Sequence, residues 1–423
     1  MLKDKKIGIW GSAVVGTSVF SFLKAQNHNC EIFDYPTSDV EKLNGFDVII
    51  PSPGINAKAI ENKILSEVDL FSEFFKKPII AVTGSLGKTT IVHILNLILK
   101  QNGLRSIAAG NIGLPLCDII PCQEDLDIAV LELSSFQLEW AKKIKPKLAI
   151  LTNLVPNHLD RHKTFESYKD AKFNLFKLQT SIDKLLAPID LAPELEILKS
   201  DKFYFSISSN FDKSNKVYFL KNSSVFFWDG FSQRLISKID SKGLNFTFLQ
   251  NWLIIFAALD LVGQKSTAID FGKFVPLENR MERFEAHEAI FYNDSKSTVL
   301  ESTLKAVESL SKEPILFLGG LSKGVDRKNS LKKLKNQASS VICFGKEADQ
   351  LNAYCQEFGI ESKSFINLED AVGFCLQIVK KGDLVLFSPG GASFDLFANY
   401  QERGKKFKEL VLKDMNVLPT KKY

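Results

Sequence analysis

The sequence predicts an α/β protein made of three consecutive α/β domains. Short apolar runs of strand length alternate with helical stretches, and these runs repeatedly end at glycine, proline or an acidic residue. Apolar strands that end in such turns are typical of parallel sheets that bind ligands at their strand ends. Three series of this kind follow one another, at residues 1–70, 71–276 and 277–423, without internal repeats or a long low-complexity linker.

The first series predicts a small parallel sheet. Its strands at 7–10, 31–33 and 47–50 lead to Gly11, Asp34 and the turn Pro51–Gly54. Gly11 and Gly16 precede a helical stretch, as in a Rossmann-like domain that binds a dinucleotide. Their spacing does not fit G-x-G-x-x-G, however, so the turn alone does not identify a ligand.

The second series begins with a strand at 78–82 and a helix whose apolar residues follow helical spacing, and it continues with strands at 128–133 and 148–154. Residues 201–240 then become aromatic and β-branched, and Asp229-Gly230 is a hairpin turn signal. This change predicts a small antiparallel subsheet within the central domain. The third series, with strands at 290–292, 315–318, 341–344 and 384–387, predicts a second Rossmann-like domain.

Composition excludes several classes of protein. Hydrophobic residues make up 45% of the 423 residues and charged residues 24%, which excludes a disordered or fibrous chain. A net charge of +5 does not indicate a nucleic-acid-binding protein. The six cysteines are scattered without a C-x-x-C pair, so neither a zinc knuckle nor a disulfide framework is expected.

No membrane segment is expected either. The longest uncharged stretch, Gly243 to Leu259, is shorter than about 18 apolar residues and contains Asn245, Gln250 and Asn251, so it predicts a buried helix. The N-terminus lacks an apolar signal region, and we therefore expect a cytoplasmic protein without membrane insertion.

The strongest local motif is Thr83-Gly84-Ser85-Leu86-Gly87-Lys88-Thr89-Thr90 between a strand and a helix. Glycines allow backbone N–H groups to approach phosphate, and the helix N-terminus favours its negative charge. Lys88 would then reach the β- and γ-phosphates, and the Thr89 hydroxyl would bind Mg²⁺. The motif favours a P-loop ATPase-like central domain over a glycine-rich turn without a ligand. Val82 stands where the general P-loop has glycine.

Two further places in the sequence contain candidate metal-binding side chains. Glu132 ends an apolar strand, where an acid either binds Mg²⁺ directly or through water, or is simply solvated. His158 and His162 are four residues apart and would share one helix face. The H-E-x-x-H zinc motif fails because Leu159 replaces its glutamate, which disfavours a zinc pair.

Six segments together resemble the Mur ligases, the ATP-dependent amide-forming enzymes that build the peptide stem of peptidoglycan. These segments are Thr83–Thr90, Asn111–Gly113, Glu132–Glu139, Asn157–Arg161, Ser388–Asp395 and Gln401–Gly404. The matches span residues 8–407 in the family's order. The resemblance implies that ATP phosphorylates the L-alanine carboxylate of UDP-N-acetylmuramoyl-L-alanine. The amine of D-glutamate then attacks this acyl phosphate and phosphate leaves.

The resemblance also implies the cofactors and the catalytic residues. Two Mg²⁺ ions, with Mn²⁺ as a substitute, would assist ATP, one bound by Thr89 and Glu132 and the other by His158 and Lys172. Lys172 would carry a CO₂-derived carbamate, whereas by itself it looks like an ordinary lysine on an exposed helix. The implied catalytic residues are Lys88, Glu132, His158, Lys172 and Lys296.

Binding residues follow from the same matches. Those for ATP are Gly84, Ser85, Gly87, Lys88, Thr89, Thr90, Asn251, Arg280 and Asp294. Those for the UDP group are Gly11, Ser12, Asp34, Ser52, Gly54 and Ile55, and those for the muramoyl-alanine end are Asn111, Ser134 and Gln137. Those for D-glutamate are Thr298, Lys323, Ser393, Phe394 and Tyr400, although core packing is an alternative for Phe394 and Tyr400.

The chain departs from the family pattern at several positions. Gln250, Ile254, Glu278, Asn279 and Asn157 replace usual family residues, which bears on adenine contacts and domain closure more than on phosphoryl transfer. Three alternatives stay open: another Mur-type or folylpolyglutamate-type amide ligase, a P-loop nucleotide-binding switch or transport ATPase, and an inactive relative kept for binding. We expect small-molecule partners, no nucleic acid and a monomer.

Overall fold

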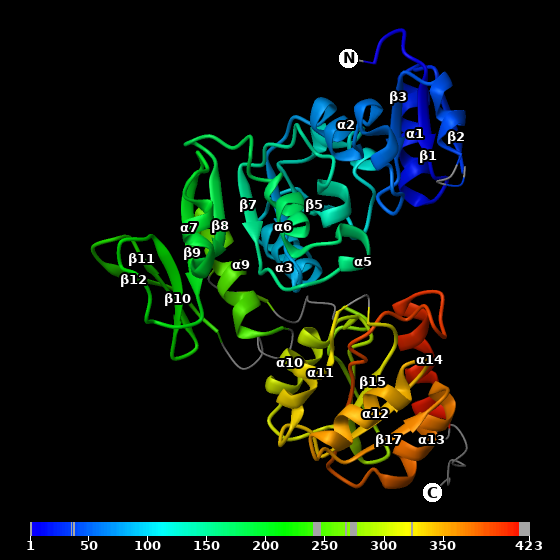
Figure 1. The fold of residues 1–423 in the computed structure, drawn as a ribbon. Helices are drawn as coiled ribbons and strands as arrows, with labels where there is room; N and C mark the ends of the chain where they lie inside the picture. The colour runs from blue at the N-terminus through cyan, green and yellow to red at the C-terminus, as the bar shows by residue number, and fades with distance from the viewer. Residues whose placement is uncertain are drawn as a thin grey trace, which may run out of the picture. The chain divides into compact units, whose positions relative to one another are not determined.

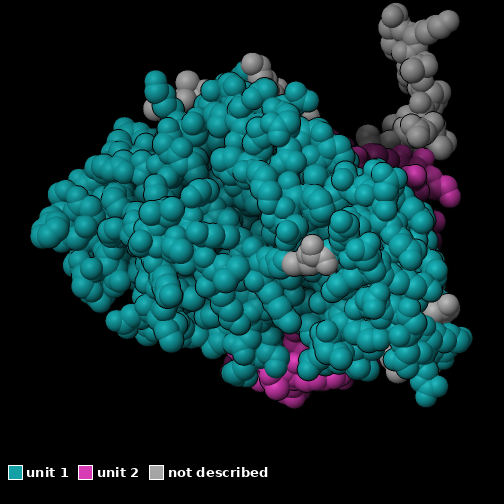
Figure 2. Space-filling view, turned by 90° about the horizontal axis from the view of Figure 1, so that it is seen from above, with its two compact units in different colours: residues 1–154, 166–274 teal, residues 155–165, 275–423 magenta. Residues whose placement is uncertain are grey.

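The computed structural model describes residues 2–34, 36, 39–239, 247–266, 269–270, 277–322 and 325–413. These residues form three β-sheets with helices beside them (Figure 1). The chain divides into two compact units (Figure 2), unit 1 with residues 1–154 and 166–274 and unit 2 with residues 155–165 and 275–423. The mixed α/β fold with three successive sheets is confirmed. The predicted domain boundaries after residues 70 and 276 stay predictions.

The first sheet of unit 1 has three parallel strands in the order β2-β1-β3. They are β1 (Ile7–Trp10), β2 (Cys30–Phe33) and β3 (Val48–Pro51), with α1 (Val14–Ala25) following β1. Trp10 pairs with Phe33 and with Pro51, so the three strands end at one edge of the sheet. The residues that follow them, Gly11 and Asp34 among them, therefore lie at that edge.

The second sheet has nine strands in the order β12-β11-β10-β9-β8-β7-β4-β6-β5. They are β4 (Ile79–Thr83), β5 (Ser106–Gly110), β6 (Ile128–Glu132), β7 (Leu148–Leu151), β8 (Lys184–Pro188), β9 (Asp201–Ser206), β10 (Val217–Lys221), β11 (Ser224–Trp228) and β12 (Gln233–Lys238). The strands from β5 to β10 pair in parallel. The predicted antiparallel strands are confirmed as β10–β12, and they continue this sheet instead of forming a separate one.

Both faces of the second sheet are covered. Alternate residues of β4 contribute to two cores, Ile79 and Ala81 to one and Ile80 and Val82 to the other. The second core includes α3 (Lys88–Gln101) and α9 (Leu249–Leu261), whose residues from Trp252 to Leu259 are almost wholly buried. The predicted buried helix is thus confirmed. Among the described residues, no helix combines the length and the apolarity that a bilayer crossing requires.

Shorter helices connect the strands of unit 1. They are α2 (Glu67–Phe74), α4 (Ser135–Leu138), α6 (Phe165–Phe173), α7 (Ala192–Leu195) and the 3-10 helices η1 (Val40–Gly45), η2 (Lys58–Lys63), η3 (Cys117–Ile119), η4 (Gln123–Asp125) and η5 (Ile189–Leu191). The helix α5 (Leu159–His162) belongs to the segment of unit 2 that interrupts them.

The sheet of unit 2 has the order β13-β14-β18-β15-β16-β17. Its strands are β13 (Glu282–Ala286), β14 (Ala289–Asn293), β15 (Ile315–Gly319), β16 (Ser340–Phe344), β17 (Ser362–Phe365) and β18 (Leu384–Phe387). All pairs are parallel except the hairpin of β13 and β14. Its helices are α10 (Leu300–Glu308), α11 (Lys328–Leu331), η7 (Lys332–Leu334), α12 (Ala348–Glu357), α13 (Leu368–Ile378) and α14 (Tyr400–Leu412).

Phe407 on α14 occupies the aromatic core of unit 2. Its ring stacks on Phe387 with centroids 4.1 Å apart and meets Phe317 edge-on at 5.5 Å.

We predict that Phe407→Ala lowers the free energy of unfolding by about 3–5 kcal/mol, because it removes a buried ring and leaves a cavity. Scanning calorimetry of the full chain measures this. Ile366→Ala, at a side chain that is 84% exposed in the same unit, should stay within about 0.5 kcal/mol of the parent. Equal losses from both substitutions would contradict the prediction.

Candidate active site

The turn Thr83–Thr90 has the backbone of a phosphate-binding loop. Gly84 has a φ of +141° and Gly87 a φ of +85°. A Cβ on Gly84 would lie 2.0 Å from Thr152 Oγ1, and one on Gly87 would lie 2.7 Å from Asn251 Oδ1. Both positions therefore require glycine. Because α3 begins directly after Gly87, the turn leads into a helix N-terminus, where the backbone N–H groups favour an anion.

The end of β7 holds this turn in place. The Leu86 N–H donates to Asn153 Oδ1 at 2.9 Å, and the Ser85 N–H donates to the Asn153 carbonyl at 3.0 Å. The Thr152 hydroxyl donates to the Leu86 carbonyl at 2.6 Å. Our sequence analysis did not identify Thr152 and Asn153. The signal that could have found them is a pair of polar residues at the end of an apolar strand beside the strand of the motif.

Two lysines share one carbonyl of the turn. Lys88 Nζ donates to the Gly84 carbonyl at 2.8 Å and to the Ser85 carbonyl at 3.1 Å. Lys172 Nζ, which comes from α6, donates to the same Gly84 carbonyl at 2.8 Å. The structure therefore brings together two lysines that the sequence places 84 residues apart.

Lys172 is buried and is not an ordinary surface lysine. Only 1% of it is exposed, and its Nζ lies 4.5 Å from the centroid of the Tyr168 ring. Burial lowers the pKa of Lys172 well below its usual value, the charge of Lys88 lowers it further, and Glu132 opposes both. The Tyr168 hydroxyl hydrogen-bonds Ser85 Oγ at 2.9 Å. Tyr168, which the sequence analysis missed, thus connects α6 to the phosphate loop.

Glu132 carries a buried oxygen without a partner. It ends β6 next to β4, opposite Val82, and only 2% of it is exposed. Its Oε1 accepts from Asn111 Nδ2 at 2.8 Å, whereas its Oε2 is buried and has no hydrogen-bond partner. A buried carboxylate oxygen in this state is suited to a cation, since unpaired buried charge is strongly unfavourable.

The residues of unit 1 fit one of the two predicted Mg²⁺ ions. Thr89 lies in the first turn of α3, and Glu132 offers its unpaired oxygen at the end of a neighbouring strand. Among the described residues, no three His, Cys, Asp or Glu side chains form a group that could hold a metal ion. The ion would therefore take most of its remaining ligands from phosphate and water, as Mg²⁺ commonly does.

His158 belongs to unit 2, in the segment 155–165. It precedes α5 with a φ of +56°, and its backbone N–H donates to Asn157 Oδ1 at 2.9 Å. Its membership of a metal site with Lys172 stays a prediction.

The segment Ser134–Gln137 begins α4 with a capping box. The Gln137 N–H donates to Ser134 Oγ at 3.2 Å, and Gln137 Oε1 accepts from the Ser134 N–H at 3.0 Å. Ser134 lies two residues after Glu132. Asn251, at the start of α9, donates through Nδ2 to Thr247 Oγ1 at 2.6 Å and lies against Gly87. The predicted ATP residues of unit 1, with Thr90 in the first turn of α3, therefore adjoin one turn.

The predicted UDP residues gather at the edge of the first sheet. Asp34 accepts from the Ser12 N–H at 2.9 Å and from the Ser12 hydroxyl, and these bonds lower the pKa of Asp34. The Ser52 hydroxyl donates to the Gly11 carbonyl at 3.3 Å. Gly54 is exposed in the turn that follows.

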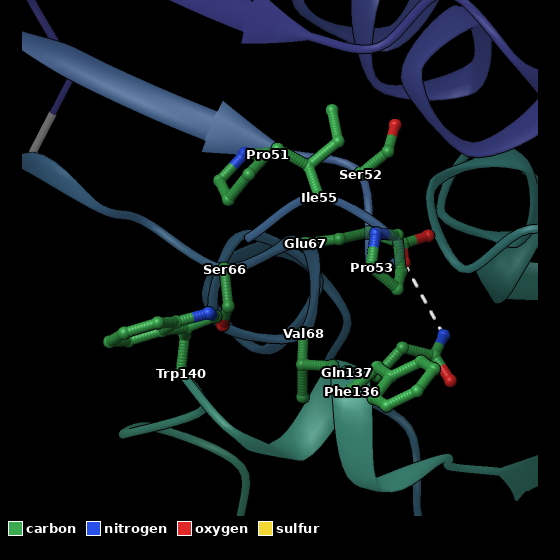
Figure 3. Close-up of a pocket in the computed structure, with 10 residues that line it drawn as sticks. All are labelled: Pro51, Ser52, Pro53, Ile55, Ser66, Glu67, Val68, Phe136, Gln137 and Trp140. Atoms are coloured by element: carbon green, nitrogen blue, oxygen red, sulfur yellow. Dashed lines mark hydrogen bonds between the residues drawn. The ribbon is translucent and has the colours of Figure 1, made fainter. Parts of the chain in front are cut away.

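A hollow joins this edge to α4 (Figure 3). Ser52 and Ile55 line it from the first sheet, and Phe136 and Gln137 line it from α4. The structure thus brings two of the predicted UDP residues, Ser52 and Ile55, and the predicted muramoyl-alanine residue Gln137 to one hollow.

Asp294 in unit 2 is a buried acid with several donors. Its Oδ2 accepts from the hydroxyls of Ser297 at 2.5 Å and Ser388 at 2.8 Å. Burial raises the pKa of Asp294 to about 6, while these hydrogen bonds and the charge of Arg280 lower it. Arg280 and Asp294, both predicted for ATP, therefore lie near each other.

The other predicted residues of unit 2 follow β14 and β18. Lys296 Nζ lies 3.9 Å from the centroid of the Tyr400 ring, Ser393 is buried and Thr298 is half-buried. Phe394 is 71% exposed, so the core-packing alternative is wrong for it. Lys323 lies outside the described residues.

Arg403 was missed as a structural centre of this region. It is fully buried, and it donates from Nε to Ser295 Oγ at 3.0 Å, from Nη1 to the Gly391 carbonyl at 2.9 Å and from Nη2 to the Ser295 carbonyl at 2.7 Å. It ties the turn after β14 to the turn after β18. The Gln401–Gly404 run was the available sequence signal.

Comparison with known proteins agrees with this geometry. The Mur ligase middle domain matches residues 82–258. A UDP-N-acetylmuramoylalanine--D-glutamate ligase from Oenococcus oeni is 32% identical over 434 residues, which cover 97% of each chain. An enzyme of the same name from Koribacter versatilis is 34% identical and covers 87% of this chain and 83% of its own.

Solved structures share the fold at lower identity. The MurF ligase from Thermotoga maritima in complex with ADP is 19% identical with a TM-score of 0.58, and the alignment covers 90% of this chain and 91% of that one. UDP-N-acetylmuramate-alanine ligase MurC from the same organism is 15% identical with a TM-score of 0.59, covering 97% and 100%. Because sequence relatives above 30% identity match over nearly their whole length, the chain belongs to the Mur ligase family.

Proposed function

We propose that the protein joins D-glutamate to the L-alanine carboxylate of UDP-N-acetylmuramoyl-L-alanine, with ATP as the energy source. The observation that carries the proposal is the buried Lys172 beside Lys88 on the Gly84 carbonyl, close to the unpaired oxygen of Glu132. This arrangement supports a reaction on phosphate groups. The names of the relatives above 30% identity support the two substrates.

The first step would transfer the γ-phosphate of ATP to the alanine carboxylate. Lys88 and the N–H groups at the start of α3 would bind the phosphates, and Thr89 and Glu132 would hold one Mg²⁺. His158 and a carbamate on Lys172 would hold a second. The phosphates of ATP and the carboxylate are both negative and repel each other. The two ions would neutralise part of this charge, which is the main requirement of phosphoryl transfer. Asn251, Arg280, Asp294 and Lys296 would bind and orient the nucleotide.

A carbamate on Lys172 requires a neutral amine. Burial and the charge of Lys88 both lower the pKa of Lys172, which favours that neutral form. Its Nζ would attack the carbon of CO₂ to form a C–N bond, the electrons of one C=O π bond would move to oxygen, and the nitrogen would lose a proton to water. The product is an anionic oxygen ligand next to Lys88, and these two opposite charges would attract each other, whereas two ammonium groups would repel.

The second step would join the amine of D-glutamate to the activated carbonyl. Thr298, Lys323 and Ser393 suit the two carboxylates of this substrate, and Phe394 and Tyr400 offer apolar contact. The neutral amine would attack the acyl carbon to form a C–N bond, phosphate would leave with the C–O bond electrons, and the nitrogen would give up one proton to the departing phosphate. The UDP group would bind Gly11, Ser12, Asp34, Ser52, Gly54 and Ile55, with the muramoyl-alanine end at Asn111, Ser134 and Gln137.

We further propose one ligand for each predicted domain: the UDP group for residues 1–70, ATP for 71–276 and the amino acid for 277–423. The reaction needs only small molecules, and we expect it to occur in the cytoplasm with the protein as a monomer.

Phosphate release tests the proposed substrates. We predict release from ATP with UDP-N-acetylmuramoyl-L-alanine only when D-glutamate is also present, because the acyl phosphate needs its amine to turn over. L-Glutamate and L-lysine serve as matched controls. Release without any amino acid would support a plain ATPase and contradict the proposal, and release with L-lysine alone would indicate a different amide ligase.

Lys172→Ala tests the carbamate. We predict a loss of turnover of at least about 100-fold, because the second ion would lose its anionic ligand. Short carboxylic acids should restore part of the activity by occupying the vacated space. Lys169→Ala is the control on the same helix, since Lys169 only pairs with Glu194 at 2.7 Å, and its turnover should stay near that of the parent. Unchanged turnover in Lys172→Ala would refute the carbamate.

Phe394→Ala tests the amino-acid site. We predict an increase in the KM for D-glutamate of about 10-fold with little change in thermal stability, because a side chain that is 71% exposed contributes little to the core. The KM for ATP should not change. A lower melting temperature with an unchanged KM for D-glutamate would show that Phe394 serves the fold instead.

A further inference from the structure

Glu67 is a buried acid to which the reaction described above assigns no role. It lies in the first turn of α2, and only 4% of it is exposed. Its Oε1 accepts from the Leu116 N–H at 3.1 Å, and its Oε2 accepts from Gln137 Nε2 at 3.5 Å, the bond drawn in Figure 3. Glu67 therefore contacts two segments that are distant from it in sequence.

Both segments lead to Glu132. Leu116 ends the loop that starts at Asn111, whose amide donates to Glu132 Oε1 at 2.8 Å. Gln137 forms the capping box with Ser134, and Ser134 lies two residues after Glu132. Glu67 is thus the common partner of the two segments proposed to bind the muramoyl-alanine end.

The orientation of the Gln137 amide depends on its partners. Gln137 Oε1 accepts from the Ser134 N–H at 3.0 Å and from the Ser134 hydroxyl at 3.1 Å, so its Nε2 must point away from Ser134. A carboxylate accepts from that Nε2. A protonated carboxyl or an amide would instead present a donor there, which favours the reversed amide and opposes the capping box.

We propose that Glu67 is a positioning residue: its carboxylate fixes the Gln137 amide and the Asn111–Leu116 loop in the arrangement that binds the acceptor substrate. The identity of that substrate, UDP-N-acetylmuramoyl-L-alanine, rests on the proposed function.

The surroundings of Glu67 make this role depend on pH. Burial raises the pKa of Glu67 to about 7 and the charge of Asp118 adds to this, while the bonds from Leu116 and Gln137 oppose it. The Cys117 thiol also faces Glu67 from η3. The other residues lining the hollow of Figure 3 are uncharged. Since the acid is protonated below its raised pKa, acceptor binding should weaken as the pH falls through about 7.

Glu67→Gln tests the proposal, because its side chain keeps the size of Glu67 but always carries a donor. Calorimetric titration of the full chain with UDP-N-acetylmuramoyl-L-alanine at pH 6 and 8 gives the dissociation constant. We expect the parent to bind about 10-fold more weakly at pH 6, and Glu67→Gln to bind at both pH values as the parent does at pH 6. The dissociation constant for ATP should be the same in both proteins.

Asp69→Asn is the matched control. Asp69 is a second buried acid on α2 whose pKa burial also raises, but its Oδ1 accepts from the backbone N–H groups of Lys142 and Lys143, each at 2.7 Å, and Ser66 also hydrogen-bonds its carboxylate. We expect Asp69→Asn to keep the pH dependence of the parent. A parental pH dependence in Glu67→Gln, or an equal loss of ATP binding, would overturn the proposal.

Trp140 fluorescence separates this proposal from the proposed function. Trp140 lines the same hollow as Glu67, and the difference between the parent and Trp140→Phe isolates its signal from the other three tryptophans. We expect a transition near pH 7 that Glu67→Gln abolishes, without any substrate present. Absence of this transition in the parent would overturn the role of Glu67 even if D-glutamate-dependent turnover is observed. Its presence without such turnover would support the positioning role and contradict only the proposed function.

Discussion

The structure of the candidate site depends on two lysine side chains that share one backbone oxygen. Lys88 and Lys172 both donate to the Gly84 carbonyl at 2.8 Å, and Lys172 is buried whereas Lys88 is half-buried. Burial lowers the pKa of Lys172 and the charge of Lys88 lowers it further, because two like charges repel in a low dielectric. Such a pair becomes favourable when an anion is present, so the turn is preorganised for phosphate or a similar charge.

The order of the strands places the partners of this pair. β4 is flanked by β6 and β7, and in a parallel sheet all three end at the same edge. β6 therefore delivers Glu132 opposite Val82, and β7 delivers Thr152 and Asn153 to the phosphate loop. The close approach of Thr152 to Gly84 in turn excludes any side chain at that glycine. Sheet topology, backbone conformation and charge thus constrain one another.

The sequence was sufficient for features that depend on neighbouring residues and insufficient for those that depend on distant ones. The glycines of the phosphate loop, the helix α3 and the acid at the end of β6 were predicted because each is encoded within about ten residues. Strands such as β17 (Ser362–Phe365) and β8 (Lys184–Pro188) were not predicted, because they are short and carry polar or charged residues. The burial of Lys172 results from the packing of α6 against the turn, and no local pattern around residue 172 reports it. Tyr168, Asn153 and Glu67 escaped for the same reason, since their partners lie 49 to 83 residues away.

Hydrogen-bond satisfaction distinguishes the buried charges that hold the fold from those suited to a ligand. Arg403 has an acceptor for each of its three nitrogens, and the carboxylate of Asp69 receives two backbone N–H groups, so both charges are compensated by the protein itself. The Lys172 amine donates to one carbonyl, and Glu132 retains an oxygen without a partner. Since incompletely paired buried polar groups lower stability, these two side chains beside a glycine-rich turn make that part of the fold less stable. A bound polyanion with its cations would supply the interactions that Lys172 and Glu132 lack. This incomplete pairing, more than any single motif, indicates where in unit 1 the substrate phosphates bind.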